Sequence, residues 1–346
     1  MAGCRAFAAV GAAGSACRKP GAVRCGDRRG RPVNISERFA YVAVFVGVLG
    51  HASSEFVAVG SGIAGPELSV WRYLFGGAGL MVLALVITGP RKLFLPLRTH
   101  AWAMLWLSIV GVSFGYLAFH WALDFATVIQ VATVVTTVPI FVGLANRVIG
   151  GQALTAVKIV TGLCAVAGLV LLITDGVLDK LVGGQDSIWG VLLALACATI
   201  GAFYAVRVKP VIAQYGALNV TALSMMIGGL GLWVGVGFGF SIWVNPLTLF
   251  DRPMSNWGWI LTLALWNTTI TQFLWFGGLA AAADMTRASY LFFLKPIIAA
   301  ALALVFLGEQ LSVLQAVAIV VVTGSVVIEI YWSKLAALAL RREKQA

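Results

Sequence analysis

The chain has 346 residues, of which 60% are hydrophobic and only 11% are charged, and its mean hydropathy is +0.96. A soluble domain has about 25% charged and 45–50% apolar residues, so the composition excludes a soluble enzyme, a nucleic-acid-binding protein and a disordered scaffold. The 24 Lys and Arg residues outnumber the 13 Asp and Glu residues and give a net charge of +11. The positions of the basic residues along the chain have to account for this excess.

Residues 1–38 form a basic segment that contains only two acids, Asp27 and Glu37. The apolar run from Ala6 to Ala13 is short and is followed by further basic residues, unlike the apolar region of a secretory signal. We expect a disordered tail or a mis-called start codon. A transit peptide is the alternative, because an Arg-rich and acid-poor start is typical of one.

Ten mostly apolar stretches follow, each about 20 residues long, which is the length that a transmembrane helix requires. They run over residues 39–59, 66–88, 101–122, 126–146, 153–173, 187–208, 217–241, 256–279, 284–307 and 312–332. Their residues do not alternate with a period of two, which argues against an outer-membrane barrel. The sequence therefore predicts an all-α integral membrane protein with ten transmembrane helices.

The basic residues predict the orientation of these helices. If the N-terminus is cytoplasmic, 20 of the 24 Lys and Arg residues lie on the cytoplasmic side, including those of the tail 333–346, and the outer loops hold only Lys180 and Arg252. Cytoplasmic loops of membrane proteins carry such an excess. We therefore place both termini in the cytoplasm and interpret the positive charge as an insertion signal and a contact for membrane lipids. No nucleic-acid partner is expected.

An internal repeat divides the ten stretches into halves at residues 39–174 and 187–332. A shift of 157 residues aligns Pro139 with Pro296, Gly151 with Gly308, and Gln152 with Glu309. A slightly smaller shift aligns Gly76-Gly77 with Gly228-Gly229. Because five is odd, two five-helix halves cross the membrane with opposite polarity. Inverted repeats of this kind are typical of secondary transporters.

Several segments resemble a known family: WRYLFGGAG in the second stretch, GYLAFHWALDFATVIQVATVVTTVP across the third and fourth, and FGGLAAAADMTRASYLFFLKP and LGEQLS in the second half. A five-helix unit that ends in proline, a short gap, Gly-Glu and a glycine-bearing last helix resembles the EamA domain. Two in tandem resemble the drug/metabolite transporter superfamily, whose members include exporters of amino acids and other metabolites, and sugar-phosphate or nucleotide-sugar exchangers. The resemblance implies two inverted EamA repeats. Gln152 departs from it, because the family often has Glu there.

Ionisable residues inside the first two stretches are candidates for function, because a charge within the bilayer is costly. His51 and Glu55 are four residues apart and share a helix face, so the pair can carry a coupling proton near neutral pH. Alternatively, Glu55 lies near the outer interface and is merely solvated. Arg72 either extends to that interface or faces a cavity, where it pairs with Glu55 or with an anionic group of the substrate.

The eighth stretch contains a dense group of uncharged polar residues that includes Asn267, Thr271 and Gln272. Amide and hydroxyl groups of this kind can hydrogen-bond neighbouring helices. Beside tryptophan they also suit a pocket for a small polar metabolite. We carry these three residues forward as candidates for substrate binding.

Lys295 lies near the middle of the ninth stretch, next to Pro296, which removes one hydrogen bond from the helix. We expect the helix to be irregular there, and we expect Lys295, with Tyr290 upstream, to bind the substrate. The alternative is that Lys295 satisfies the freed backbone or pairs with Glu329 or Glu55. Glu309 is expected to cap the last helix, and with Pro139, Pro296 and Gly308 it is assigned a structural role.

The sequence shows no nucleophile–base set, phosphate-binding loop or metal cluster, so we expect neither an enzyme nor a cofactor. It predicts a secondary transporter in the cytoplasmic membrane that exports a small polar metabolite, such as an amino acid or related carboxylate-bearing compound, by alternating access. A channel-like facilitator and a sugar-phosphate or nucleotide-sugar exchanger are the alternatives.

Overall fold

The computed structural model describes residues 22–26, 32–63, 65–126, 131, 134–174, 187–298, 301 and 312–343, and these residues are mostly helical. The first half contains α2 (Glu37–Ser61), α3 (Gly65–Thr88), α4 (Pro90–Leu93), α5 (Leu95–Trp106), the π-helix η1 (Leu107–Phe114), α6 (Gly115–Ala122), α8 (Val138–Gly150) and α9 (Ala156–Thr174). The second half contains α10 (Ser187–Tyr215), α11 (Ala217–Phe240), the 3-10 helix η3 (Pro246–Asp251), α12 (Met254–Ala264), the π-helix η4 (Leu265–Ile270), α13 (Thr271–Ala281), α14 (Met285–Ser289), the 3-10 helix η5 (Tyr290–Leu294) and α16 (Val313–Glu343).

Several helices are suited to a bilayer. By length and composition, five helical stretches of the described residues can cross a membrane: Glu37–Ala58, Gly65–Thr88, Pro90–Ala122, Ile188–Tyr215 and Ala217–Phe240. Shorter apolar helices cover Val138–Gly150, Ala156–Leu171 and Ala316–Trp332. Large apolar side chains also face outward, with Trp102 78% and Val86 79% exposed, as lipid contact requires. The all-α membrane fold is thus confirmed, and the count of ten crossings stays a prediction.

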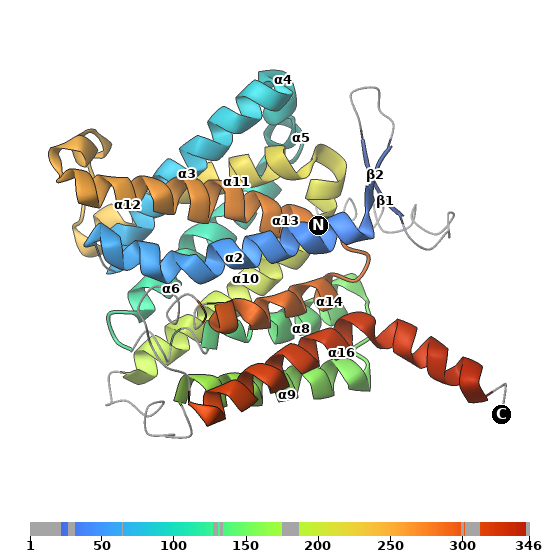
Figure 1. Ribbon diagram of the computed structural model, residues 1–346. Coiled ribbons are helices and arrows are strands. Elements are labelled where there is room, and N and C mark those ends of the chain that lie inside the picture. The colour runs from blue at the N-terminus through green and yellow to red at the C-terminus, as the bar shows by residue number, and fades with distance from the viewer. Residues whose placement is uncertain are drawn as a thin grey trace.

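The long helices lie side by side in one bundle (Figure 1). α2 begins and α16 ends at the same end of this bundle, and the last turns of α16 extend past the other helices (Figure 1). We call this end, which also contains the turns at residues 89, 151–155, 216 and 282–284, the terminal end. α2 packs on α13, and α9 packs on α16, so contacts between distant parts of the sequence hold the bundle together.

Helices α3 and α11 approach each other closely at the aligned glycine pairs. A Cβ atom on Gly77 of α3 would lie 2.9 Å from the carbonyl oxygen of Met225 in α11, and one on Gly229 of α11 would lie 2.6 Å from that of Tyr73 in α3. The two helices therefore meet backbone to backbone, with each half contributing the equivalent residue. Small residues permit such contacts in membrane proteins.

The aligned third helices share an irregularity. Both contain a π-helical segment, η1 in the first half and η4 in the second. η1 packs on α11 and η4 packs on α3, so each π-helix contacts the second helix of the opposite half. Gly228 lies against Val112 of η1, and Gly76 lies against Thr268 of η4. Because π-helical turns are frequent at functional sites, these segments direct attention to the space between the halves.

The glycine contact gives a stability prediction. In Gly229→Ala the added methyl group meets backbone rather than a movable side chain, so α3 and α11 must separate, at a cost of about 1–3 kcal/mol. We expect a lower Tm for the detergent-solubilised variant. Gly235→Ala in the same helix is the control, because nothing lies within 4 Å of its added Cβ. Equal Tm values for the two variants would show that the helices yield easily.

Two details differ from the sequence prediction. In the basic segment, for which we expected disorder, β1 (Ala22–Gly26) pairs antiparallel with β2 (Pro32–Ser36), and their Val and Ile residues favour strands. The sixth stretch is predicted to end at residue 208, but α10 continues to Tyr215 with Pro210 inside it. The basic residues Arg207 and Lys209 suggested an end there, yet a helix can extend beyond the apolar layer and carry basic residues.

Candidate functional site

A cavity of about 80 Å³ lies between the two halves, lined by residues of α2, α3, η1, α6, α8, α10, α13 and η5 and by Lys295. Most of the lining is apolar or aromatic, including Phe119, Tyr204, Trp275 and Phe292. A few polar groups in an apolar wall are typical of a site for a small molecule. The volume suits a ligand, or a ligand group, of only a few non-hydrogen atoms.

Arg72 enters the cavity from α3 and is only 3% exposed. Its Nε donates to Thr268 Oγ1 at 3.1 Å, and its Nη2 donates to the carbonyl oxygen of Asn267 at 3.1 Å. Both acceptors belong to η4, so a helix of the second half fixes an arginine of the first. The sequence left two positions open for Arg72, the outer interface and a cavity, and in the structure it lies in the cavity.

Lys295 enters the same cavity from the other half and is 5% exposed. Its Nζ lies 6.0 Å from the ring centre of Phe119 and 5.9 Å from that of Phe292, distances at which an ammonium group is attracted to an aromatic face. The 3-10 helix η5 ends directly before it, which confirms the irregularity predicted next to Pro296. Lys295 thus lies where the backbone changes its helical type.

The charged residues of the described lining are therefore both cations, Arg72 and Lys295. Glu329, a predicted alternative partner of Lys295, instead lies 3.4 Å from Nε of Arg287. Glu55 belongs to α2, but its side chain falls outside the part of the chain that the structure describes. Two buried cations in a small cavity favour an anionic ligand group, because opposite charges attract more strongly in a protein interior than in water.

His51 also lines the cavity, where its ring makes edge contacts with Trp275 at 5.7 Å and Phe292 at 5.4 Å between ring centres. Its Nε2 is buried and has no hydrogen-bond partner among the described residues. The imidazole therefore has a free nitrogen at the cavity wall. Its predicted pairing with Glu55 stays a prediction.

The polar residues of the eighth stretch lie behind the lining. Asn267 Nδ2 donates to the carbonyl oxygen of Gly50 at 2.6 Å, and Thr271 Oγ1 donates to that of Trp266 at 2.8 Å. Gln272 Nε2 donates to the hydroxyl of Tyr116 at 2.8 Å. Tyr116 itself lines the cavity, so Gln272 positions a lining residue. These contacts fix helices and neighbouring groups, and they place none of the three residues on the cavity surface.

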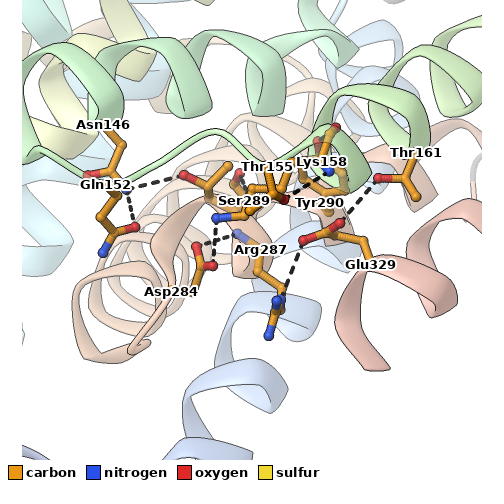
Figure 2. A network of polar contacts seen from close by, with 11 residues as sticks. Asn146, Gln152, Thr155, Lys158, Thr161, Asp284, Arg287, Ser289, Tyr290 and Glu329 are labelled. Carbon is orange, nitrogen blue, oxygen red and sulfur yellow. Dashed lines mark hydrogen bonds and ion pairs between the residues drawn. The ribbon is translucent and has the colours of Figure 1, made fainter. Parts of the chain in front are cut away.

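A second polar cluster lies at the terminal end of the bundle (Figure 2). Lys158 Nζ of α9 lies 2.7 Å from Asp284 Oδ2, and the lysine side chain is 7% exposed. Asp284 also caps α14 by accepting from the backbone N–H of Arg287 at 3.0 Å. Tyr290, a predicted substrate residue, donates to the carbonyl oxygen of Lys158 and lies in this cluster rather than on the cavity.

The cluster continues through side chains of both halves. Thr161 Oγ1 donates to Glu329 Oε2 at 3.3 Å, and Asn146 Nδ2 donates to Thr286 Oγ1 at 3.2 Å. Asn146 Nδ2 also lies 2.7 Å from Gln152 Oε1, so the glutamine keeps a hydrogen-bonding role without a charge. Figure 2 shows these groups along one seam between the green helices of the first half and the orange and red helices of the second. We call this set the seam cluster.

The residues predicted to be structural are only partly described. Pro139 lies in the first turn of α8, where its missing N–H is not needed. Pro296 follows η5 directly. Gly308 and Glu309 fall outside the described residues.

Sequence reasoning missed Tyr204 and the Lys158–Asp284 pair. Tyr204 is 3% exposed within the apolar α10, and a buried tyrosine hydroxyl usually has a specific partner, which was the available signal. Lys158 and Asp284 are separated by more than a hundred residues, and nothing in the sequence indicates that they meet.

Comparison with known proteins gives consistent matches. The model of the EamA-like transporter family matches residues 38–174 and 188–331. An "Uncharacterized inner membrane transporter YicL" of Salmonella typhimurium is 28% identical over 287 residues, 80% of this chain and 88% of that protein. An "Uncharacterized transporter" of Clostridium kluyveri is 22% identical over 262 residues, 74% of this chain and 80% of that protein.

A solved crystal structure superimposes with a TM-score of 0.68 at 21% identity and covers 88% of this chain and 98% of that one. At this identity the match supports the fold.

Proposed function

Because the chain belongs to the EamA-like transporter family and is a multi-pass membrane protein, we propose that it transports a small polar metabolite that carries a carboxylate or similar anionic group. The observation that carries this proposal is the pair of buried cations, Arg72 and Lys295, in one cavity between the halves. Arginine can bind an oxyanion with its planar fork, whereas lysine acts as a compact point charge. Amino acids and related carboxylates have the required size and charge.

The mechanism that we propose is alternating access by two inverted five-helix repeats. The equivalent glycine contacts of α3 and α11 and the equivalent π-helices support this symmetry. Substrate sites at such repeat interfaces are alternately exposed as one part moves against the other. In this scheme the seam cluster closes the terminal end of the bundle, and its cross-half contacts must break before substrate can pass there.

We further propose that the protein lies in the cytoplasmic membrane, with both termini in the cytoplasm, and exports its substrate. The name of the Salmonella relative supports the inner membrane, and the distribution of Lys and Arg supports the orientation. The seam cluster then lies at the cytoplasmic side.

Flux measurements in proteoliposomes test the function. Untargeted metabolomics of cells with and without the protein supplies the substrate, and saturable, substrate-specific flux is expected.

If His51 and Glu55 carry a coupling proton, Glu55→Gln should abolish flux driven by a pH gradient while substrate exchange continues. Unchanged gradient-driven flux in Glu55→Gln would remove proton coupling by this pair, and unsaturable flux in the wild type would indicate a channel.

Reporter fusions test the topology. A reporter that is active only outside the cytoplasm should be silent when fused after Lys344 and active when inserted at Gly183, because the topology predicted from the sequence puts 20 of the 24 basic residues on the cytoplasmic side. The opposite pattern would refute the proposed orientation.

A further inference from the structure

A second, larger hollow of about 500 Å³ lies between α5–η1 and α10. It shares only two lining residues, Gly111 and Tyr204, with the cavity that contains Arg72 and Lys295, which we call the transport cavity. We call it the lateral groove. Its lining is almost entirely apolar and includes Trp102 and Trp106, which are 78% and 60% exposed. Exposed tryptophans on a membrane protein lie at the interface or face the lipid, so this groove opens sideways toward the bilayer.

We propose that the lateral groove binds one anionic phospholipid, with an acyl chain along its apolar wall and the phosphate on Arg207. Arg207 is exposed and is the single charged residue of the groove lining. It belongs to none of the ion pairs found among the described residues. The inference goes beyond the proposed function and depends only on the position of the protein in a membrane.

The dimensions of the groove fit one leaflet. On α10 its lining runs from Thr199 to Val211, a rise of roughly 18 Å at 1.5 Å per residue. Half of a hydrocarbon core of about 30 Å is about 15 Å. Pro210 and Val211 line the end nearest the termini, close to Arg207, and the deep end is at Gly111 and Ile200. A phospholipid of one leaflet can therefore bind with its charged phosphate at Arg207 and its acyl chain extending toward Gly111 and Ile200.

The groove also adjoins the transport site through a thin wall. A Cβ atom on Gly111 would lie 2.7 Å from Cγ of Tyr204, so the tyrosine ring rests directly on the glycine backbone. The ring of Tyr204 packs edge-on against Phe276 at 4.9 Å between centres. A lipid chain in the groove covers the outer side of this wall and separates the charged groups of the cavity, Arg72 and Lys295, from the bilayer.

Native mass spectrometry of the full chain in mild detergent tests the proposal. Dioleoylphosphatidylglycerol and dioleoylphosphatidylcholine are titrated separately, because they share acyl chains and differ in net charge. The wild type is expected to retain one phosphatidylglycerol at a lower concentration than phosphatidylcholine. Arg207→Gln should weaken phosphatidylglycerol binding about tenfold, as expected for the loss of a charge-assisted contact. It should weaken phosphatidylcholine binding less, because the choline cation already compensates the charge of that phosphate.

Two further variants separate a built site from general attraction. Arg147→Gln removes another exposed arginine at the same end of the bundle, outside the groove lining, and should bind both lipids as the wild type does. Ala103→Phe places a ring in the groove and should weaken binding of both lipids. Equal affinity of the wild type for the two lipids, or equal losses in Arg147→Gln and Arg207→Gln, would overturn the proposal. Binding is measured without transport, so it can fail or succeed independently of the proposed function.

Discussion

Lys295→Met is expected to raise the KM for the anionic substrate by a factor of roughly ten to a hundred. A charge-assisted hydrogen bond contributes about 1.5–3 kcal/mol, and each 1.4 kcal/mol is a tenfold change in affinity. The variant should still insert into the membrane, because methionine makes this stretch more apolar. Lys295→Arg should restore only part of the affinity, since a planar guanidinium does not reproduce a compact ammonium charge.

Lys209→Met is the matched control for this substitution. Lys209 is partly buried, donates to the carbonyl oxygen of Ala282 at 3.1 Å and does not line the cavity. We expect its KM to remain near that of the wild type. A wild-type KM in Lys295→Met would show that Lys295 serves only the helix, and Arg72 would become the leading anionic anchor. Substrate-dependent flux in proteoliposomes supplies both values.

The sequence predicts the ends of several helices closely, because physical signals mark them. The sequence predicts the second stretch at 66–88, and α3 covers Gly65–Thr88, bounded by Gly65-Pro66 and Gly89-Pro90. It predicts the seventh stretch at 217–241, and α11 covers Ala217–Phe240. Glycine at positive φ ends or begins these segments, as at Gly89 and Gly216. Such local signals do not depend on the tertiary structure.

Side-chain contacts were less predictable. Asn267 and Gln272 have the composition of a polar pocket, yet the same amides can hold helices together, and only the direction of each side chain distinguishes the two roles. Arg72 shows the converse, because the flanking Trp71 and Tyr73 favoured an interface as much as a cavity. Its acceptors, Thr268 and the Asn267 carbonyl, belong to the opposite half of the chain. Nothing in the spacing of these residues along the sequence indicates that they meet.

The seam cluster gives the last prediction, which concerns the conformational equilibrium. Asp284→Asn should keep the N-cap of α14, since asparagine caps about as well as aspartate, but it removes the partner of Lys158. The lysine side chain is 7% exposed and the aspartate side chain is 25% exposed, so the substitution leaves a nearly buried cation unpaired. Opening the terminal end would hydrate this cation, and we expect the open population to increase about tenfold.

Distances between spin labels at Ala153 and Ala283 measure this change, in a background without native cysteines. Both positions are exposed at the terminal end, one on each side of the seam cluster. The wild type should show one short distance, and Asp284→Asn should add a longer one. Glu67→Gln is the control, because it breaks the pair with Arg252 at the opposite end, where both side chains are 33% exposed and such a pair contributes little.

A second substitution distinguishes a gate from simple destabilisation. Lys158→Met removes the buried charge itself, and a buried pair replaced by apolar groups often costs little, whereas an orphaned charge costs much. We therefore expect Lys158→Met, alone or combined with Asp284→Asn, to open the terminal end less than Asp284→Asn alone. If all three variants show the wild-type distance, the seam cluster fastens these helices in every state of the transport cycle. Substrate would then have to leave by a different route.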